Sequence, residues 1–205
     1  KDLNLDVNGT VSLVEIIDKP IQDIKFAGNV TTDSIAVVAG IADTAYRAQI
    51  RSDISLTQSV SVRSEIRFQG FNAGTLLDQD SLLTLTGTLK SAVRVDEKEL
   101  ATSVESDSLL ISNQTAKYFL DTLSFSTLLS PEKSNINYFT DNGHAKLLSN
   151  FDIRDATTVI DKWSSEMLGS DSSLHRSTNR TAQLDMELKD PGLFQLLGID
   201  VDDFS

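Results

Sequence analysis

The chain contains no cysteine and only two histidines among its 205 residues. The absence of cysteine excludes disulfide bridges and every metal site built on thiolates. His144 and His175 have no evident catalytic partners, and Asn142-Gly143 predicts a hairpin turn that places His144 at the start of the next strand. The sequence holds no nucleophile elbow, phosphate-binding glycine loop or His-Glu-x-x-His motif. The sequence therefore favours a protein that is not an enzyme and that holds no cofactor or metal.

Basic residues and long apolar runs are also scarce. Lysine and arginine total 18 against 30 acidic residues, a formal net charge of −12, and no basic cluster is present to neutralise phosphates. This composition argues against a nucleic-acid partner. The longest apolar run, residues 35–42, is interrupted by Gly40 and is far shorter than the roughly 20 residues of a helical membrane span. Because the chain starts at Lys1 and shows no signal sequence, we expect it to be part of a longer protein.

The clearest pattern in the sequence is an alternation of apolar and polar residues over positions 46–69. Side chains of a strand point alternately to its two faces, so the alternation predicts an antiparallel hairpin of two long strands around Thr57-Gln58-Ser59. One face would be charged and would face water. Only Ser52 and Ser64 interrupt the other face, which consists of Tyr46, Ala48, Ile50, Ile54, Leu56, Val60, Val62, Ile66 and Phe68.

Similar alternation recurs along most of the chain and predicts further strands of the same kind. These strands involve residues 3–13, 24–30, 35–38, 83–90, 93–95, 109–111, 123–126, 145–153 and 182–188. The apolar residues that we expect to continue the interior face are Leu83, Leu85, Leu89, Phe125, Leu147, Phe151, Leu184, Met186 and Leu188. The expected fold is mainly β, and no internal domain boundary is evident over residues 1–205.

Two short sequence units recur at irregular intervals. An apolar-x-Gly-x-apolar unit is centred on Gly9, Gly28 and Gly87. Glycine within a strand indicates a bulge, a bend or a close backbone approach, and recurrent bends would curl a sheet. The second unit, Asp-Ser/Thr-aliphatic, predicts a turn that leads into a strand, and it begins at Asp33, Asp80, Asp107 and Asp121. The irregular spacing predicts an elongated array and not a strict solenoid.

Two segments depart from the alternation and predict helices. Apolar residues spaced by three and four predict an amphipathic helix over residues 156–168, with Asp155 as N-cap and Gly169 at its end. A short helix is predicted over residues 191–197. The longer helix would act either as a cap packed on the apolar face or as a movable gate over it, through Val159, Ile160, Trp163 and Met167.

An apolar face of this size requires a cover. Each valine, leucine, isoleucine or phenylalanine left in water forgoes about 1.5–3 kcal/mol. Ten such residues would forgo about 15–30 kcal/mol, which is comparable with or above the whole stability of a domain. A second sheet, a helix or a bound apolar ligand must therefore cover the face.

Long alternating strands, Asp-Ser-Leu turns and glycine-centred units in series resemble the periplasmic region of the TamB family of AsmA-like proteins. The closest local similarity runs from Tyr118 to Leu168 and includes Leu120-Asp121-Thr122-Leu123-Ser124-Phe125 and Leu148-Ser149-Asn150-Phe151-Asp152-Ile153. The segment Leu184-Asp185-Met186-Glu187-Leu188 is similar to this family as well.

This resemblance implies a β-taco, a sheet curled into a groove with an apolar inside and a polar outside. It implies a periplasmic location, within a protein anchored in the inner membrane. The implied cargo is phospholipid, whose acyl chains would lie in the groove against its lining residues. The implied partner is an outer-membrane barrel of the TamA type. The function would be phospholipid transport, outer-membrane protein assembly or both.

The residue pattern leaves two classes of function open. The first is a non-enzymatic, lipid-conducting groove that bridges the inner and outer membranes. The second is a structural or adhesive module of a large bacterial surface protein, built as a closed β-sandwich or β-solenoid whose apolar face is sealed by protein. Both predict alternating strands and no catalytic site. An open, lipid-filled channel would separate them.

Overall fold

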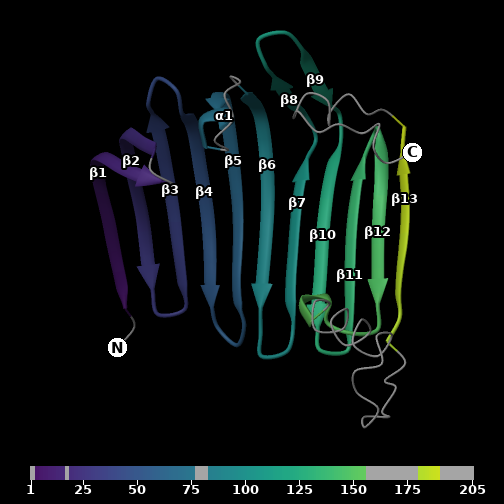
Figure 1. The fold of residues 1–205 in the computed structure, drawn as a ribbon. Helices are drawn as coiled ribbons and strands as arrows, with labels where there is room; N and C mark the ends of the chain where they lie inside the picture. Colours follow the sequence, from purple (N-terminus) through teal and green to yellow (C-terminus); the bar gives the residue numbers. More distant parts are fainter. Residues whose placement is uncertain (1–2, 17–18, 77–82, 156–179, 190–205) are drawn as a thin grey trace, which may run out of the picture.

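The structure is a computed structural model that describes residues 3–16, 19–76, 83–155 and 180–189. These residues form one antiparallel sheet of 13 strands. In Figure 1 the strands of the main path lie side by side, and β8 and β9 project beyond them. The strands are β1 (Asn4–Ile16), β2 (Lys19–Thr31), β3 (Ser34–Ala42), β4 (Arg47–Leu56), β5 (Val60–Asn72), β6 (Thr84–Val95), β7 (Leu100–Ser106), β8 (Leu109–Ser112), β9 (Lys117–Leu120), β10 (Leu123–Ser130), β11 (Lys133–Thr140), β12 (Gly143–Ser149) and β13 (Ala182–Leu188). The prediction of a mainly β chain is confirmed.

Helical structure within the described residues is limited to two short segments. The helix α1 comprises Ala73–Leu76, and the 3-10 turn η1 comprises Ile153–Asp155. Neither segment coincides with a predicted helix. The helices predicted over residues 156–168 and 191–197 lie outside the described residues, as do Val159, Ile160, Trp163 and Met167 and also His175.

The strands form a meander that is interrupted once. The sheet follows the chain from β1 to β7 and then continues through β10 to β13, while β8 and β9 leave this path. Strand β6 pairs with β8 near its start, at Thr84 to Gly87, and with β7 over its second half. Strands β8 and β9 thus leave the main sheet together, between β7 and β10.

The predicted Asp-Ser/Thr units mark these changes of direction. The unit at Asp33 lies in the turn between β2 and β3, as predicted. The units at Asp107 and Asp121 lie at bends, between β7 and β8 and between β9 and β10, after which a strand begins. The unit at Asp80 lies outside the described residues. The two bends do not reverse the chain, so β8 and β9 project from the main sheet as an antiparallel hairpin.

The register places the apolar residues of successive strands opposite one another. In the predicted hairpin, Ile50 faces Ile66 and Ile54 faces Val62, so the even-numbered residues share one face of the sheet. The next strand continues this face, since Val62 also faces Val93. Residues that face each other in a ladder lie on the same side of a sheet. One apolar side therefore extends from β1 to β13.

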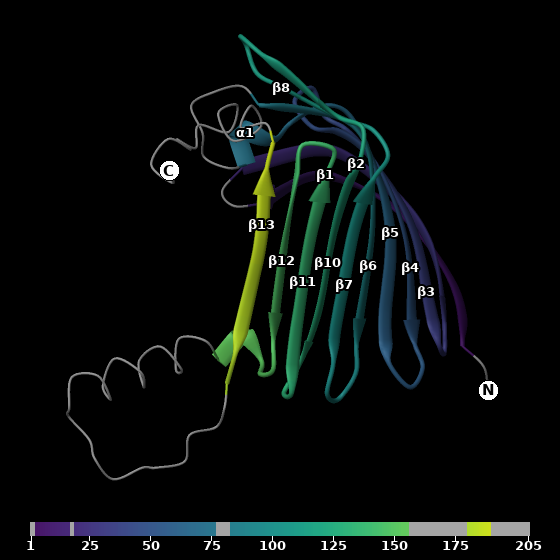
Figure 2. The ribbon, with the colours of Figure 1, turned by 90° about the vertical axis from the view of Figure 1, so that its right-hand side faces the viewer.

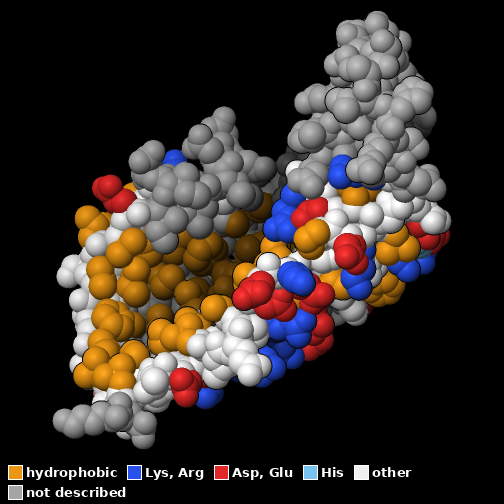
Figure 3. Space-filling view, turned by 90° about the horizontal axis from the view of Figure 1, so that it is seen from below, with side chains coloured by type: hydrophobic (Ala, Val, Ile, Leu, Met, Phe, Trp, Pro, Cys, Tyr) orange, Lys and Arg blue, Asp and Glu red, His pale blue; other side chains and the backbone are white. Residues whose placement is uncertain are grey.

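The sheet is curved, with its apolar side on the hollow. Figure 2 shows the strands arranged along an arc. Figure 3 shows hydrophobic side chains gathered on a hollowed surface, with acidic and basic side chains grouped beside it. We call the hollow apolar side the inner face and the charged side the outer face. The core cluster of buried residues lies at one end of the inner face, around α1 and β8–β9, and contains Ala73, Leu83, Leu109, Ile111 and Leu120.

Glycine is required at two positions near this end. Gly87 has a φ of +145°, and a Cβ atom built there would lie 2.4 Å from the carbonyl oxygen of Ser108. Only glycine therefore lets β8 approach β6 so closely, as the glycine-centred unit predicted. Gly70, with a φ of +67°, lies at a register shift between Gln69 and Phe71. This bulge moves the inner face from even to odd positions.

Three strands are absent from the sequence prediction, and one predicted strand is wrong in part. The missed strands are β7, β9 and β11. The prediction carried the strand after His144 through Phe151 to Ile153, whereas β12 ends at Ser149 and Ile153 begins η1. The hydroxyl groups of Ser134 and Ser149 donate hydrogen bonds to the carbonyl oxygen of Phe151, at 3.0 and 2.6 Å. These bonds hold Phe151 in a turn and end the strand.

Candidate functional site: the inner face of the sheet

Most of the predicted groove-lining residues lie together on the inner face. Cross-strand register places them there from β4 to β13. They are Ile50, Ile54, Leu56, Val60, Val62, Ile66, Phe68, Leu85, Leu89, Phe125, Leu147, Leu184, Met186 and Leu188.

The other predicted lining residues lie at the two ends of the strands. Tyr46 and Leu83 are buried at the end that carries α1, where the Tyr46 ring contacts Phe71 with a centroid distance of 5.4 Å. The carbonyl oxygen of Leu83 accepts hydrogen bonds from the backbone N–H groups of Ala73 and Gly74. Phe151 is buried at the opposite end, beside η1. These residues help to close the ends of the hollow and do not line its middle.

The inner face carries no charge from β3 to β13. From Ile35 on β3 to Leu188 on β13, no Asp, Glu, Lys or Arg occupies an inner-face register position, whereas Glu15, near the end of β1, has the same register parity as Leu5. The residues in the middle of the sheet are half-buried, while those toward its edges are open. Leu5 is 52% exposed and Met186 is 68% exposed. The apolar surface thus continues to both edges of the sheet.

The outer face carries the charged side chains of the same strands. Arg51 faces Glu65, Glu65 faces Lys90, and Lys90 faces Glu105 across β4 to β7. Opposite charges alternate along this row, and Glu65 also forms an ion pair with Arg67 at 2.7 Å. A shallow cavity of about 410 Å³ lies over the row. Because each cation has an acidic neighbour, the row presents no strong field of one sign to a ligand.

The polar side chains of the inner face carry hydroxyl groups. Ser52 and Ser64, which the sequence marked as the only interruptions of the hairpin, face each other with their Oγ atoms 2.7 Å apart. Ser91 continues this row on β6. Thr102 on β7 and Thr127 on β10 form a second pair, with Oγ1 atoms 2.7 Å apart. The sequence analysis did not identify the hydroxyl groups of Ser91, Thr102 and Thr127 as inner-face groups. A hydroxyl at an inner position breaks the apolar alternation from which the face was predicted.

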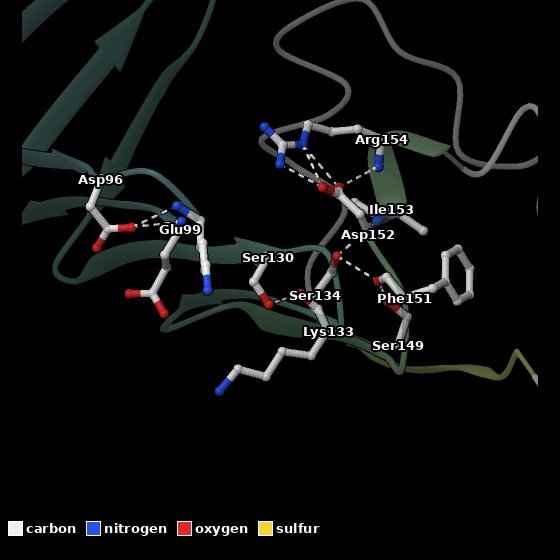
Figure 4. Close-up of polar contacts among 11 residues, drawn as sticks. Asp96, Glu99, Ser130, Lys133, Ser134, Ser149, Phe151, Asp152, Ile153 and Arg154 are labelled. Carbon is white, nitrogen blue, oxygen red and sulfur yellow. Dashed lines mark hydrogen bonds and ion pairs between the residues drawn. The ribbon is translucent and has the colours of Figure 1, made fainter.

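Two serines organise the end of the hollow that lies near η1 (Figure 4). The hydroxyl of Ser134 donates to the carbonyl oxygen of Phe151 and accepts from the backbone N–H of Ile153 at 2.8 Å. Ser149 donates to the same carbonyl oxygen. The guanidinium group of Arg180 lies 5.6 Å from the centre of the Phe151 ring. Two hydrogen bonds therefore hold the backbone of Phe151 in place, and the guanidinium group of Arg180 covers its ring.

The adjacent ion pair stabilises η1. Arg154 donates hydrogen bonds from its side chain to both carboxylate oxygens of Asp152, with Nε at 2.9 and 3.0 Å. The backbone N–H of Arg154 also donates to Asp152 at 3.0 Å. These bonds from Arg154 favour the ionised carboxylate and lower the pKa of Asp152 below its usual value. Asp152 is buried, so we interpret the Asp152–Arg154 ion pair as a structural contact that stabilises this end of the hollow.

His144 lies on the outer face, at the start of β12 after the Asp141-Asn142 turn, as predicted. Its Nδ1 atom is 3.5 Å from a carboxylate oxygen of Glu187, and its Nε2 atom is 3.8 Å from one of Asp185. Both carboxylates belong to the edge strand β13. The described residues contain no group of three or more His, Asp or Glu side chains arranged to hold a metal ion.

Within the described part of the chain, no helix has the length and apolar character required to cross a membrane. Comparison of the chain with protein-family models, with curated proteins and with solved structures gave no match.

Proposed function

We propose that the inner face binds the acyl chains of phospholipids and that the curled sheet is a non-enzymatic groove of the β-taco type. The observation that carries this proposal is the continuous, uncharged apolar surface that runs across the strands from Ile35 to Leu188. An acyl chain is long, flexible and uncharged, so it matches such a surface without leaving a polar group unpaired.

The exposure of large apolar side chains supports an apolar ligand. Leu184 and Met186 are 63% and 68% exposed, and Leu56 and Val60 are also exposed. Burying one such side chain stabilises by about 1.5–3 kcal/mol. Contiguous apolar surface of this extent is typical of a binding site and not of a surface that faces only water. A lipid that covers the inner face would supply this stabilisation.

The wider setting of the groove follows the resemblance to the TamB family. In this proposal the chain belongs to an inner-membrane-anchored protein of the periplasm that bridges the two membranes. It conducts phospholipid, serves outer-membrane protein assembly, or does both. Its partner is an outer-membrane barrel of the TamA type. The alternating strands and the hollowed apolar side support this setting.

The test of the proposal is site-specific photocrosslinking in the periplasm of a Gram-negative host. A photoreactive amino acid at Ile50 would face the hollow, whereas the same amino acid at Gln49 would face outward. We expect phospholipid adducts at Ile50 and none at Gln49, identified by mass spectrometry. Protein adducts at Ile50 without lipid would contradict a lipid groove.

A structural or adhesive module is the second candidate, and the edges of the sheet favour it. Among the described strands, β1 and β13 each pair on one side only, and β1 is 13 residues long. Unpaired edges are templates for further strands. The closed-sandwich form of this candidate requires two sheets, whereas the described strands form one. Lipid-free protein in the crosslinking test would favour this candidate.

A further inference from the structure

The edge strand β13 is open on one side and exposed along its whole length. Within the described part of the chain it pairs only with β12, and Figure 1 shows it at the border of the sheet. All of its residues are exposed, and Leu184 and Met186 are more exposed than any other large hydrophobic residue that the structure describes. An exposed strand with an open edge is a surface to which a further strand can add.

The bonds at the two ends of β13 show which of its backbone groups point to the open edge. The N–H of Lys189 donates to the carbonyl oxygen of Asn142 at 2.8 Å, and the carbonyl oxygen of Thr181 accepts from the N–H of Asn150 at 3.1 Å. In an antiparallel pair, the N–H and C=O groups of alternate residues point to opposite sides of the strand. The odd-numbered residues therefore bond to β12, and the N–H and C=O groups of the even-numbered residues of β13 point to the open edge.

The side chains of β13 divide between the two faces of the sheet. Its even-numbered residues are apolar and continue the inner face to this edge. Asp185 and Glu187 lie between them on the outer face, with 68% and 54% of their side-chain surface exposed. A strand that pairs with this edge must therefore place apolar residues on the inner face and match two carboxylates on the outer face.

Strand β12 is an example of such a partner, because it pairs with the other side of β13. Lys146 lies opposite Asp185, and His144 lies opposite Glu187 with its Nδ1 atom 3.5 Å from the carboxylate. The residue between these two basic positions is apolar and lies on the inner face. The same alternation of apolar and basic residues would match the open side of β13.

A second copy of this chain does not match the open edge. Full antiparallel overlap of two β13 strands would place Asp185 opposite Asp185, and like charges directly opposite each other destabilise a strand pair. The other edge strand, β1, contains no lysine or arginine that could face the two carboxylates. The partner that the edge requires is therefore a different strand, which carries basic residues.

We propose that the open edge of β13 binds an extended segment of a partner protein in which apolar residues alternate with lysine or arginine. The segment adds as a further antiparallel strand, since the neighbouring strands β11, β12 and β13 all pair in this way. Its apolar residues extend the inner face, and its basic residues pair with Asp185 and Glu187. Lipid binding at the inner face does not use the backbone groups of the edge, so the two proposals are independent of each other.

The test measures the binding of synthetic peptides to the full chain by isothermal titration calorimetry. The probe is an end-capped peptide of the same length as β13, with valine at its odd positions and lysine between them. A matched peptide carries glutamate in place of lysine. Because two attractive cross-strand pairs become repulsive, the glutamate peptide should bind at least about fivefold more weakly. Hydrogen exchange should slow in β13 when the lysine peptide is bound.

Backbone methylation of the peptide tests the hydrogen bonds without changing the protein. In an antiparallel pair, a residue whose N–H and C=O groups point to the partner exchanges both bonds with the residue directly opposite. The valines, which lie opposite the even-numbered residues of β13, are therefore the residues that bond. N-methylation of the valines should abolish binding, whereas N-methylation of the lysines, whose N–H groups point away, should preserve it.

Two variants at one position test the same edge from the side of the protein. Met186→Pro removes an N–H group that points to the open edge, and proline is tolerated in an edge strand where its nitrogen faces solvent. Met186→Ala is the matched control, because it shortens the side chain but keeps the N–H. We expect Met186→Pro to lose at least about tenfold in affinity for the lysine peptide and Met186→Ala to lose less. Thermal unfolding checks that both variants fold.

The peptide series decides the proposal even if the proline variant does not fold. Absence of binding, equal affinity for the lysine and glutamate peptides, or equal affinity for the two methylated peptides would overturn the strand addition. Self-association of the chain without peptide binding would overturn it as well and would identify a second copy as the partner. These outcomes leave the lipid groove intact, since the photocrosslinking experiment tests it separately.

Discussion

Ser52 and Ser64 face each other across the β4–β5 hairpin with their hydroxyl oxygens 2.7 Å apart, on a face where their neighbours along both strands are apolar. Each serine satisfies part of the hydrogen-bonding capacity of the other, so the pair interrupts the apolar surface at a small cost. The contact also shows that the two strands keep one register through the middle of the hairpin. The strength of the Ser52–Ser64 contact can be measured by mutation.

The first prediction is that these two serines are energetically coupled. Ser52→Ala or Ser64→Ala alone leaves a half-buried hydroxyl without its partner and should lower the free energy of unfolding by about 0.5–1.5 kcal/mol. The double variant should lose clearly less than the sum, because neither hydroxyl remains. Urea unfolding of the four proteins in a double-mutant cycle measures the coupling. Strict additivity would mean that the two hydroxyls do not interact.

The second prediction concerns which face of the hairpin is covered. Ile50→Asp places a charge on the apolar inner face and should lower the free energy of unfolding by about 2–4 kcal/mol. Gln49→Asp adds the same charge on the outer face of β4, opposite Arg67, and should change stability by no more than about 0.5 kcal/mol. Chemical denaturation of both variants makes the comparison. Equal losses would show that the facing is wrong.

The third prediction concerns the crossing of β6 and β8. Gly87→Ala forces a Cβ atom against the carbonyl oxygen of Ser108 at a backbone conformation that alanine disfavours. We expect a loss of about 2 kcal/mol or more in the free energy of unfolding. Gly40→Ala is the control, since a Cβ atom there has no neighbour within 4 Å. That change should be neutral or should stabilise by up to about 1 kcal/mol. A Gly87→Ala variant as stable as Gly40→Ala would contradict the crossing.

The fourth prediction concerns how the stabilising contribution of the Asp152–Arg154 ion pair at η1 depends on pH. Hydrogen bonds from Arg154 lower the pKa of Asp152 below the usual value of 3.8. A carboxyl with a lowered pKa in the folded state stabilises the protein above its unfolded pKa, and this contribution disappears as the pH falls through the folded pKa. The stability difference between wild type and Asp152→Asn should therefore be constant from neutral pH down to about pH 5 and shrink below about pH 4.

Unfolding in urea at a series of pH values measures this difference. Arg154→Gln removes the cause of the shift and should remove most of the pH-dependent part of the contribution of Asp152. A stability difference that is the same at pH 3 and pH 6 would refute the assignment.

The alternation of residues by itself determined the elements of this fold that depend on local periodicity. In residues 46–69 the side chains alternate without help from distant contacts, because a strand places successive residues on opposite faces whatever lies beside it. The hairpin of β4 and β5 and its apolar even-numbered side followed directly. The turn before His144 and the need for glycine at position 87 followed from equally local rules.

The tertiary structure alone decided what happens where the inner face carries hydroxyl groups. Strands β7 and β11 place Thr102, Ser106, Ser134 and Thr140 inward, so their sequences lack the apolar period that marks a strand. Distant contacts also stop β12 at Ser149, through the bonds of Ser134 and Ser149 to Phe151. That the buried hydroxyl of Ser106 has no hydrogen-bond partner within the described residues depends on strands that are neighbours in space, because hydrogen bonds are satisfied in three dimensions and not along the chain.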